Sequence, residues 1–198
     1  MEKPQLTLDE ATHTYWVGTR KLPSVTTIMS DLGLSHNFSG ISSFYAQRGT
    51  AVHKAVELVD KGTLDDSTLD PRLSGYVSGY RRFLRESGYG AEYWEVPLYS
   101  ESLSFAGTID KLGTLNGRFG VLDIKTSRTL DPAVELQLCA YTLLWNENRT
   151  ERPAEFKYAL QLTEGGDYSL TTKYSSASID LWVSVMDVYR WKLKHVRK

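Results

Sequence analysis

Two aspartates near the middle of the chain are spaced to share one face of a β-hairpin. Asn116-Gly117 separates two runs of alternating apolar residues, and this dipeptide is typical of a two-residue turn with positive φ at both positions. If these residues form the turn, Asp110 lies directly opposite Asp123, and Lys125 points to the same face two residues later. Side chains opposite each other on antiparallel strands lie about 5 Å apart.

Two carboxylates held this close repel each other unless a cation lies between them. Hard divalent ions such as Mg²⁺ and Mn²⁺ prefer carboxylate oxygens, so the hairpin predicts a site for one or two of these ions. A neighbouring lysine could orient or deprotonate a metal-bound water, or neutralise a phosphate oxygen. The alternative is an exposed hairpin with scattered polar residues, because Asp-x-Lys alone is a common sequence.

The composition limits the class of protein. The chain has 198 residues, of which 41% are hydrophobic and 24% charged, and this predicts one domain over residues 1–198. The net charge of −1 excludes a surface that is basic throughout but allows a local basic patch. Cys139 is the only cysteine, so this chain alone cannot hold a disulfide, a four-cysteine zinc site or an iron–sulfur cluster with four cysteine ligands.

No run of apolar residues approaches ~18 in length, and no basic and apolar signal segment opens the chain. We therefore expect a cytoplasmic location, in a bacterium or a phage-infected cell.

The hydrophobic pattern alternates between extended and helical segments. This order favours an α/β fold in which helices flank a mixed central sheet, with an extra hairpin and helices at the N-terminus. Strands are expected at about 91–100, 104–115, 118–126, 155–163 and 168–173, and a small hairpin at 5–20. Helices are expected at about 24–29, 41–61 with a bend or break at Gly49, 71–88, 132–146, and from 178 to the end.

Further candidate residues lie on two of these helices. His53 follows Thr50, which could cap the helix, and Glu57 lies one turn later, where it could hold the imidazole or be an ordinary surface residue. Gln137 and Tyr141 are also one turn apart, on the helix after the hairpin. Because that helix must pack back near the strand it follows, one of its faces can overhang the carboxylates.

Other charged residues are near these positions in the sequence. Glu95, on the strand beside the hairpin, is predicted either to support the metal ligands from behind or to be an ordinary solvated residue. Arg48, Lys54, Lys111 and Arg118 are candidates for binding a nucleic-acid backbone, because the net charge gives no general attraction.

Four short motifs, taken together, resemble those of the RecB-like branch of the PD-(D/E)XK nucleases. They occur in the family's order and on the expected elements: Gly49-x-x-x-His53, Gly107-x-x-Asp110, Asp123-x-Lys125 and Gln137-x-x-x-Tyr141. The opening of the chain, with His13-x-Tyr15 and Leu22-Pro23-Ser24-Val25-Thr26, is more weakly similar to stand-alone phage members. Mitochondrial genome maintenance exonucleases belong to the same branch.

The resemblance implies a restriction-endonuclease-like core and a metal-dependent deoxyribonuclease that leaves 5′-phosphate products. An exonuclease acting in DNA recombination, repair or phage DNA processing fits this small chain best. DNA is the implied substrate, and a second copy of the chain or a recombination protein is a candidate partner. Relatives often carry an iron–sulfur cluster, which this chain cannot hold.

The resemblance also implies a role for each motif residue. The metal, Mg²⁺ or Mn²⁺, would be bound by the side chains of His53, Asp110 and Asp123 and by the backbone carbonyl of Ile124. Lys125 would be the catalytic lysine, with Gln137 and Tyr141 positioning the DNA strand or the lysine. The sequence departs from the family name at Ile109, where proline would precede the first aspartate, and at Asp123, where glutamate is common.

Two rival functions share this fold. A structure-specific endonuclease would use the same residues, whereas a non-catalytic nucleic-acid-binding module would not need Asp110, Asp123 and Lys125 together. A zinc enzyme or a Cys/His hydrolase is disfavoured because the histidines show no metal-binding spacing and Cys139 lies among apolar residues.

Overall fold

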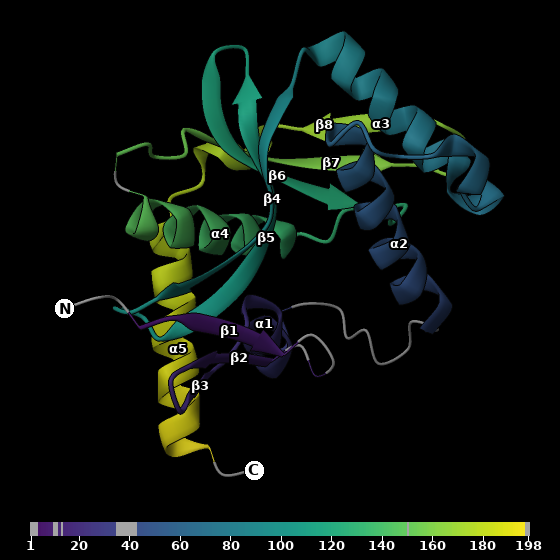
Figure 1. Ribbon diagram of the computed structural model, residues 1–198. Helices are drawn as coiled ribbons and strands as arrows, with labels where there is room; N and C mark the ends of the chain where they lie inside the picture. Colours follow the sequence, from purple (N-terminus) through teal and green to yellow (C-terminus); the bar gives the residue numbers. More distant parts are fainter. Residues whose placement is uncertain (1–3, 10–11, 13, 35–42, 150, 197–198) are drawn as a thin grey trace.

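A five-stranded mixed sheet forms the centre of the computed structural model (Figure 1), which describes residues 4–9, 12, 14–34, 43–149 and 151–196. The strands lie in the order β4-β5-β6-β7-β8, and all neighbours are antiparallel except β6 and β7. This confirms the predicted fold class. The strands are β4 (Gly90–Ser100), β5 (Phe105–Leu115), β6 (Arg118–Lys125), β7 (Phe156–Leu162) and β8 (Tyr168–Thr171).

Helices cover both faces of this sheet (Figure 1). On one face, α1, α4 and α5 share a core with β5 and β6 that includes Phe105, Leu138 and Trp182. On the other face, α2 and α3 pack against β6 and β7. The helices are α1 (Val25–Asp31), α2 (Ser43–Asp60), α3 (Ser74–Ser87), α4 (Val134–Asn148) and α5 (Asp180–His195), with short 3-10 turns at Asp66–Thr68, Pro71–Leu73 and Lys173–Ser176. None of the helices among the described residues is both long and apolar enough to cross a bilayer.

The N-terminal segment forms a second antiparallel sheet of three strands: β1 (Leu6–Asp9), β2 (Thr14–Val17) and β3 (Arg20–Leu22). The predicted hairpin is therefore correct but misses the third strand. This sheet is fixed to the central one, because Ala106 donates its backbone N–H to Pro23 at 3.0 Å and Tyr15 is hydrogen-bonded to Thr108. His13, part of the weaker family likeness, lies outside the described residues.

The turn between β5 and β6 has the predicted form. Asn116 and Gly117 have φ values of 51° and 75°, as a turn with two positive φ angles requires. The register is also as predicted over five residue pairs, from Leu115 opposite Arg118 to Lys111 opposite Leu122. The ladder ends there, one pair before the two aspartates.

Two details of α2 differ from the sequence prediction. The helix runs through Gly49 without a break, and it begins at Ser43, so Thr50 is an interior residue and not an N-cap. The first two residues of the predicted helix, 41 and 42, lie outside the described residues.

Helix α3 crosses the β7–β8 turn at very close range. A Cβ atom built on Gly75 would lie 1.7 Å from the backbone oxygen of Glu164, and one on Gly79 would lie 3.1 Å from the oxygen of Asp167. Only glycine allows the helix backbone to come this near, which fixes α3 against the edge of the sheet.

We expect Gly75→Ala to lower the free energy of unfolding by about 3 kcal/mol, because the methyl group overlaps rigid backbone. Gly90→Ala is the matched control, since a Cβ there meets nothing within 4 Å, and it should change stability by about 0.5 kcal/mol or less. Urea unfolding curves measure both. Equal stabilities of the two variants would contradict this packing.

Candidate active site

The backbone of Ile124 lies at the point where β5 separates from β6. Its N–H donates to Oδ2 of Asp110 at 3.0 Å, and its carbonyl oxygen lies 3.1 Å from Nε2 of His53. Both groups would otherwise point toward β5, whose ladder with β6 has ended at Lys111. Two side chains thus replace the missing strand partner, and this brings α2, β5 and β6 together.

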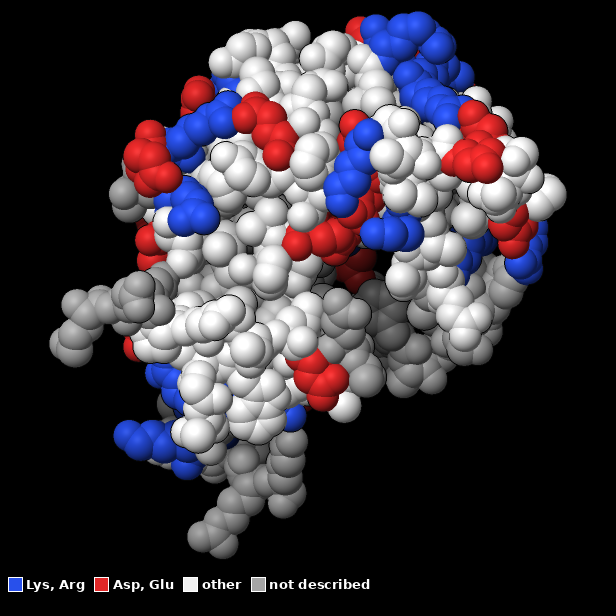
Figure 2. Space-filling view, in the orientation of Figure 1, with Lys and Arg blue, Asp and Glu red and all other residues white. Residues whose placement is uncertain are grey.

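Three side chains gather beside this carbonyl. Ligand atoms of His53, Glu95 and Asp110, which we call the His–acid cluster, all lie within 4.8 Å of one another. Nδ1 of His53 is 3.5 Å from Asp110 Oδ2 and 3.9 Å from Glu95 Oε1. Figure 2 shows a hollow in the face between β4 and α2, with acidic side chains at its edge and in its depth.

Glu95 reaches the cluster through an unusual backbone conformation. Its φ is +46°, in the left-handed region that non-glycine residues rarely adopt. The regular alternation of faces also breaks here, because Ile109 and Leu112 belong to the same core although they are three residues apart on one strand. The kink turns Glu95 and Asp110 toward α2, where the sequence predicts only a supporting role for Glu95.

Burial shifts the protonation of Glu95. Loss of hydration, followed by the nearby Asp110 carboxylate, raises the pKa of Glu95 to about 7, although His53 acts in the opposite direction. Near neutral pH this acid is therefore balanced between its two forms, and a bound cation would favour the ionised one.

Asp123 is the most deeply buried acid of the site, with 1% of its surface exposed. Nζ of Lys125 lies 2.7 Å from its Oδ2 as an ion pair. Among the described residues, no hydrogen-bond donor reaches the other carboxylate oxygen, Oδ1. Burial raises the pKa of Asp123 to about 6, partly offset by Lys125 and increased by Asp110.

A chain of polar contacts leads from Lys125 into α4. The ammonium group donates to Oε1 of Gln137 at 2.9 Å, and Nε2 of Gln137 donates to the hydroxyl of Tyr141 at 2.9 Å. Burial alone would lower the pKa of Lys125, but the Asp123 and Asp110 carboxylates outweigh it and raise the pKa, so the lysine stays charged. Burial, then both carboxylates, raises the pKa of Tyr141, so its hydroxyl stays protonated.

The donor atoms fit a hard divalent cation. The ring of His53 has oxygen atoms near both nitrogens, with the Ile124 carbonyl at 3.1 Å and Asp110 Oδ2 at 3.5 Å. A neutral imidazole carries one N–H, so one nitrogen can donate to an oxygen while the other offers its lone pair to a metal. Among the described residues, Asp123 lies outside the group of ligand atoms that are within 4.8 Å of one another. The carbonyl of Ile124, next to His53, is a further oxygen of the kind that Mg²⁺ and Mn²⁺ prefer.

The other predicted residues have different surroundings. Glu57 accepts ion pairs from Lys54, at 2.9 Å, and from Lys61, so it is occupied by lysines and not by His53. Lys54, which follows His53 on α2, remains largely exposed despite this pair. Arg118 lies at the other end of β6, paired with Glu155. Lys111 is buried, with 2% of its surface exposed, and cannot reach a DNA backbone.

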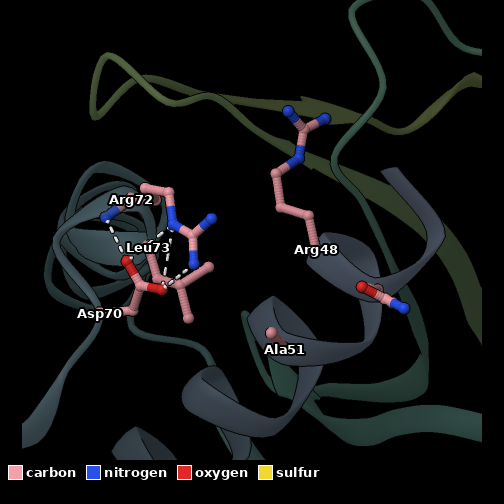
Figure 3. Close-up of a pocket in the computed structure, with 6 residues that line it drawn as sticks. Arg48, Ala51, Asp70, Arg72 and Leu73 are labelled. Atoms are coloured by element: carbon pink, nitrogen blue, oxygen red, sulfur yellow. Dashed lines mark hydrogen bonds and ion pairs between the residues drawn. The ribbon is translucent and has the colours of Figure 1, made fainter. Parts of the chain in front are cut away.

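Arg48 faces α3. Its guanidinium lies 5.5 Å from the ring centre of Tyr76, and it borders a pocket of about 160 Å³ between α2 and the segment before α3 (Figure 3). Across this pocket, Nε of Arg72 donates to both carboxylate oxygens of Asp70, at 3.0 and 3.1 Å. Figure 3 shows Arg48 extending away from that pair.

Tyr15 is a neighbour of the site, and it belongs only to the weaker family likeness, which implies no role for it. Its hydroxyl lies 2.8 Å from Oγ1 of Thr108, two residues before Asp110. Burial raises its pKa, and Glu95 adds to the effect. The docking of one sheet against another brings it here, and no local sequence pattern reports such a contact.

No family model matches the chain, and no curated protein matches its sequence. Among solved structures, the chain is similar to a crystal structure from Eubacterium rectale described as a "putative exonuclease". The TM-score is 0.50 at 12% sequence identity, and the match covers 88% of this chain and 73% of that one. This likeness shows a shared fold.

The buried Asp123 makes stability depend on pH in a defined direction. Its folded pKa, about 6, lies above the ordinary value of 3.8, so the metal-free folded state binds the proton more tightly and loses stability as pH rises from about 4 to 7. Asp123→Asn should therefore raise the free energy of unfolding at pH 7.5 by on the order of 1 kcal/mol and leave it unchanged near pH 4.

Urea unfolding in EDTA at both pH values tests this. The control is Asp187→Asn, an exposed acid on α5, which should give a similar, small effect at both. A loss of stability in Asp123→Asn at pH 7.5 would show that the buried carboxylate is stabilising without metal.

Proposed function

We propose that this chain is a Mg²⁺- or Mn²⁺-dependent deoxyribonuclease of the RecB-like PD-(D/E)XK type, acting as an exonuclease. The observation that carries the proposal is the arrangement around Ile124. One backbone unit joins His53 and Asp110, while Asp123 and Lys125 flank it on the same strand. The motif resemblance and the fold shared with a protein described as an exonuclease support it.

The metal would be held by the His–acid cluster, by Asp123 and by the Ile124 carbonyl. When bound, such an ion polarises the scissile phosphate and lowers the pKa of a coordinated water. The protein's own contribution is a rigid set of oxygen and nitrogen donors. The folded protein already holds these donor atoms close together despite their mutual repulsion. They therefore need little rearrangement when a cation binds.

Lys125 supplies a fixed positive charge beside Asp123. Oε1 of Gln137 accepts a hydrogen bond from the ammonium group of Lys125, which limits the directions in which its other two N–H bonds can point. An ammonium group held in this way can stabilise charge that develops on a phosphate oxygen. The buried Tyr141 hydroxyl accepts from Nε2 of Gln137 and so fixes the amide that orients Lys125.

The DNA strand would enter over the hollow seen in Figure 2. Lys54, whose side chain is exposed and which follows His53 on α2, is the proposed phosphate contact. We propose that residues 1–198 act as one nuclease domain, because the N-terminal sheet shares the wall of the site through Tyr15. The ends of linear DNA in recombination, repair or phage DNA processing are the substrates that the resemblance implies.

Lys125→Ala should lower the cleavage rate by about 10³-fold, because it removes the fixed positive charge and the ion pair that keeps Asp123 ionised. The assay is end-labelled linear and closed-circular DNA, single- and double-stranded, with Mg²⁺, Mn²⁺ or EDTA. Lys21→Ala, on an exposed strand of the N-terminal sheet, is the control. Shortening of linear DNA alone establishes an exonuclease, and nicking of circles establishes an endonuclease.

Near-full activity of a folded Lys125→Ala protein would contradict the assignment. DNA binding without cleavage in any metal by the unaltered protein would indicate the non-catalytic binding module.

Lys54→Ala should weaken DNA binding and reduce the slope of log affinity against log salt by about 1, as expected for one phosphate contact. Arg118→Ala is the matched control, because Arg118 is likewise an exposed base paired with a glutamate but lies at the far end of β6 from Ile124. Fluorescence anisotropy over a salt series in Ca²⁺ measures both. If Arg118→Ala has the larger effect, DNA crosses the hairpin tip instead.

A further inference from the structure

A buried polar network lies immediately behind the His–acid cluster. The ammonium of Lys111 pairs with Oδ2 of Asp60, and each of these side chains is only 3% exposed. Oδ1 of Asp60 accepts from the hydroxyl of Tyr80 at 2.7 Å, and Oδ2 accepts from Nε1 of Trp94 at 2.9 Å. The Lys111 ammonium also lies 5.2 Å from the centre of the Tyr80 ring. We call these four residues the buried network.

The buried network and the His–acid cluster draw on the same three elements. On β4 and β5, Trp94 and Lys111 are cross-strand partners, and they are the direct neighbours of Glu95 and Asp110. On α2, Asp60 lies seven residues after His53, which places both on the same face of the helix. Only Tyr80, on α3, belongs to an element with no residue in the cluster.

Net stability is a weak reason for keeping such a pair. Two charges that lose their hydration gain little overall, even when they attract each other strongly. A buried pair with further hydrogen bonds does restrict geometry, because each partner accepts only a few directions. Here the restricted geometry is that of α2 against β4 and β5.

We propose that the buried network is a positioning device, which fixes α2 against the β4–β5 pair and thereby sets the spacing of the His–acid cluster. The role of the network in metal binding rests on the proposed function, because the cluster is the proposed metal site. Its effect on the spacing of the cluster is a property of the metal-free protein. In the metal-free protein the carboxylates of the cluster repel one another. The network opposes this repulsion by linking α2 to β4 and β5.

The test compares Lys111→Met with Tyr80→Phe. The first variant removes the link between α2 and β5, whereas the second removes one hydrogen bond of the same network from α3. The readout is amide hydrogen exchange of Ile124 in metal-free protein, because its N–H is bonded to Asp110. Exchange rates are compared after correction for the global unfolding free energy of each variant, measured in urea.

We expect the amide hydrogen of Ile124 to exchange about tenfold faster in Lys111→Met than in the unaltered protein. A factor of about ten corresponds to the net free energy of one hydrogen bond. In Tyr80→Phe the corrected rate should change less than about twofold. Equal corrected rates in the two variants would overturn the proposal. If Lys111→Met does not fold, the test uses Trp94→Phe, which removes the N–H that β4 donates to Asp60. The corrected exchange rate of Ile124 should then increase about threefold.

Calorimetric titration of Mn²⁺ separates this inference from the proposed function. The dissociation constant should rise about tenfold in Lys111→Met and stay within about twofold in Tyr80→Phe. If the unaltered protein binds no Mn²⁺, the proposed function fails while the exchange result still decides the network. If binding is present and equal in all variants, the network does not set the spacing of the metal site.

Discussion

The separation of β5 from β6 is the constraint on which the rest of the site depends. Buried backbone groups must be hydrogen-bonded, and the separation leaves Ile124 without a strand partner on one side. Asp110 and His53 take the place of that partner. The same step that satisfies the backbone therefore concentrates acids in one place, where their negative charges repel one another.

Each side of the sheet contributes a different kind of group to this place. From the α2 side comes the imidazole of His53, and the Glu95–Asp110 kink turns carboxylates toward it. From the α4 side come Gln137 and Tyr141, whose hydrogen bonds orient the ammonium group of Lys125. The site lies where the two cores meet, so neither core alone determines its geometry.

Local patterns predict the parts of this arrangement that local geometry determines. Asn116-Gly117 sets the register of the hairpin, because a two-residue turn leaves one pairing, and this register brings Asp110 and Asp123 to the same end of the two strands. The left-handed backbone of Glu95 and the burial of Lys111 cannot be predicted in the same way. The conformation of Glu95 results from a kink that β4 and β5 share, and the burial of Lys111 results from the packing of α2. The sequence around a charged residue does not show whether a helix distant in the chain will cover it.

The conformation of Glu95 has a consequence for any attempt to engineer this chain. Glycine reaches positive φ without the clash of a Cβ atom, whereas glutamate bears a cost of about 1 kcal/mol there. Screens that reward thermal tolerance alone would therefore favour glycine at this position and delete an acid of the cluster. Thermal stability and retention of the acidic side chain therefore place opposite demands on residue 95. A useful library should keep this residue fixed and seek stabilising substitutions at other positions.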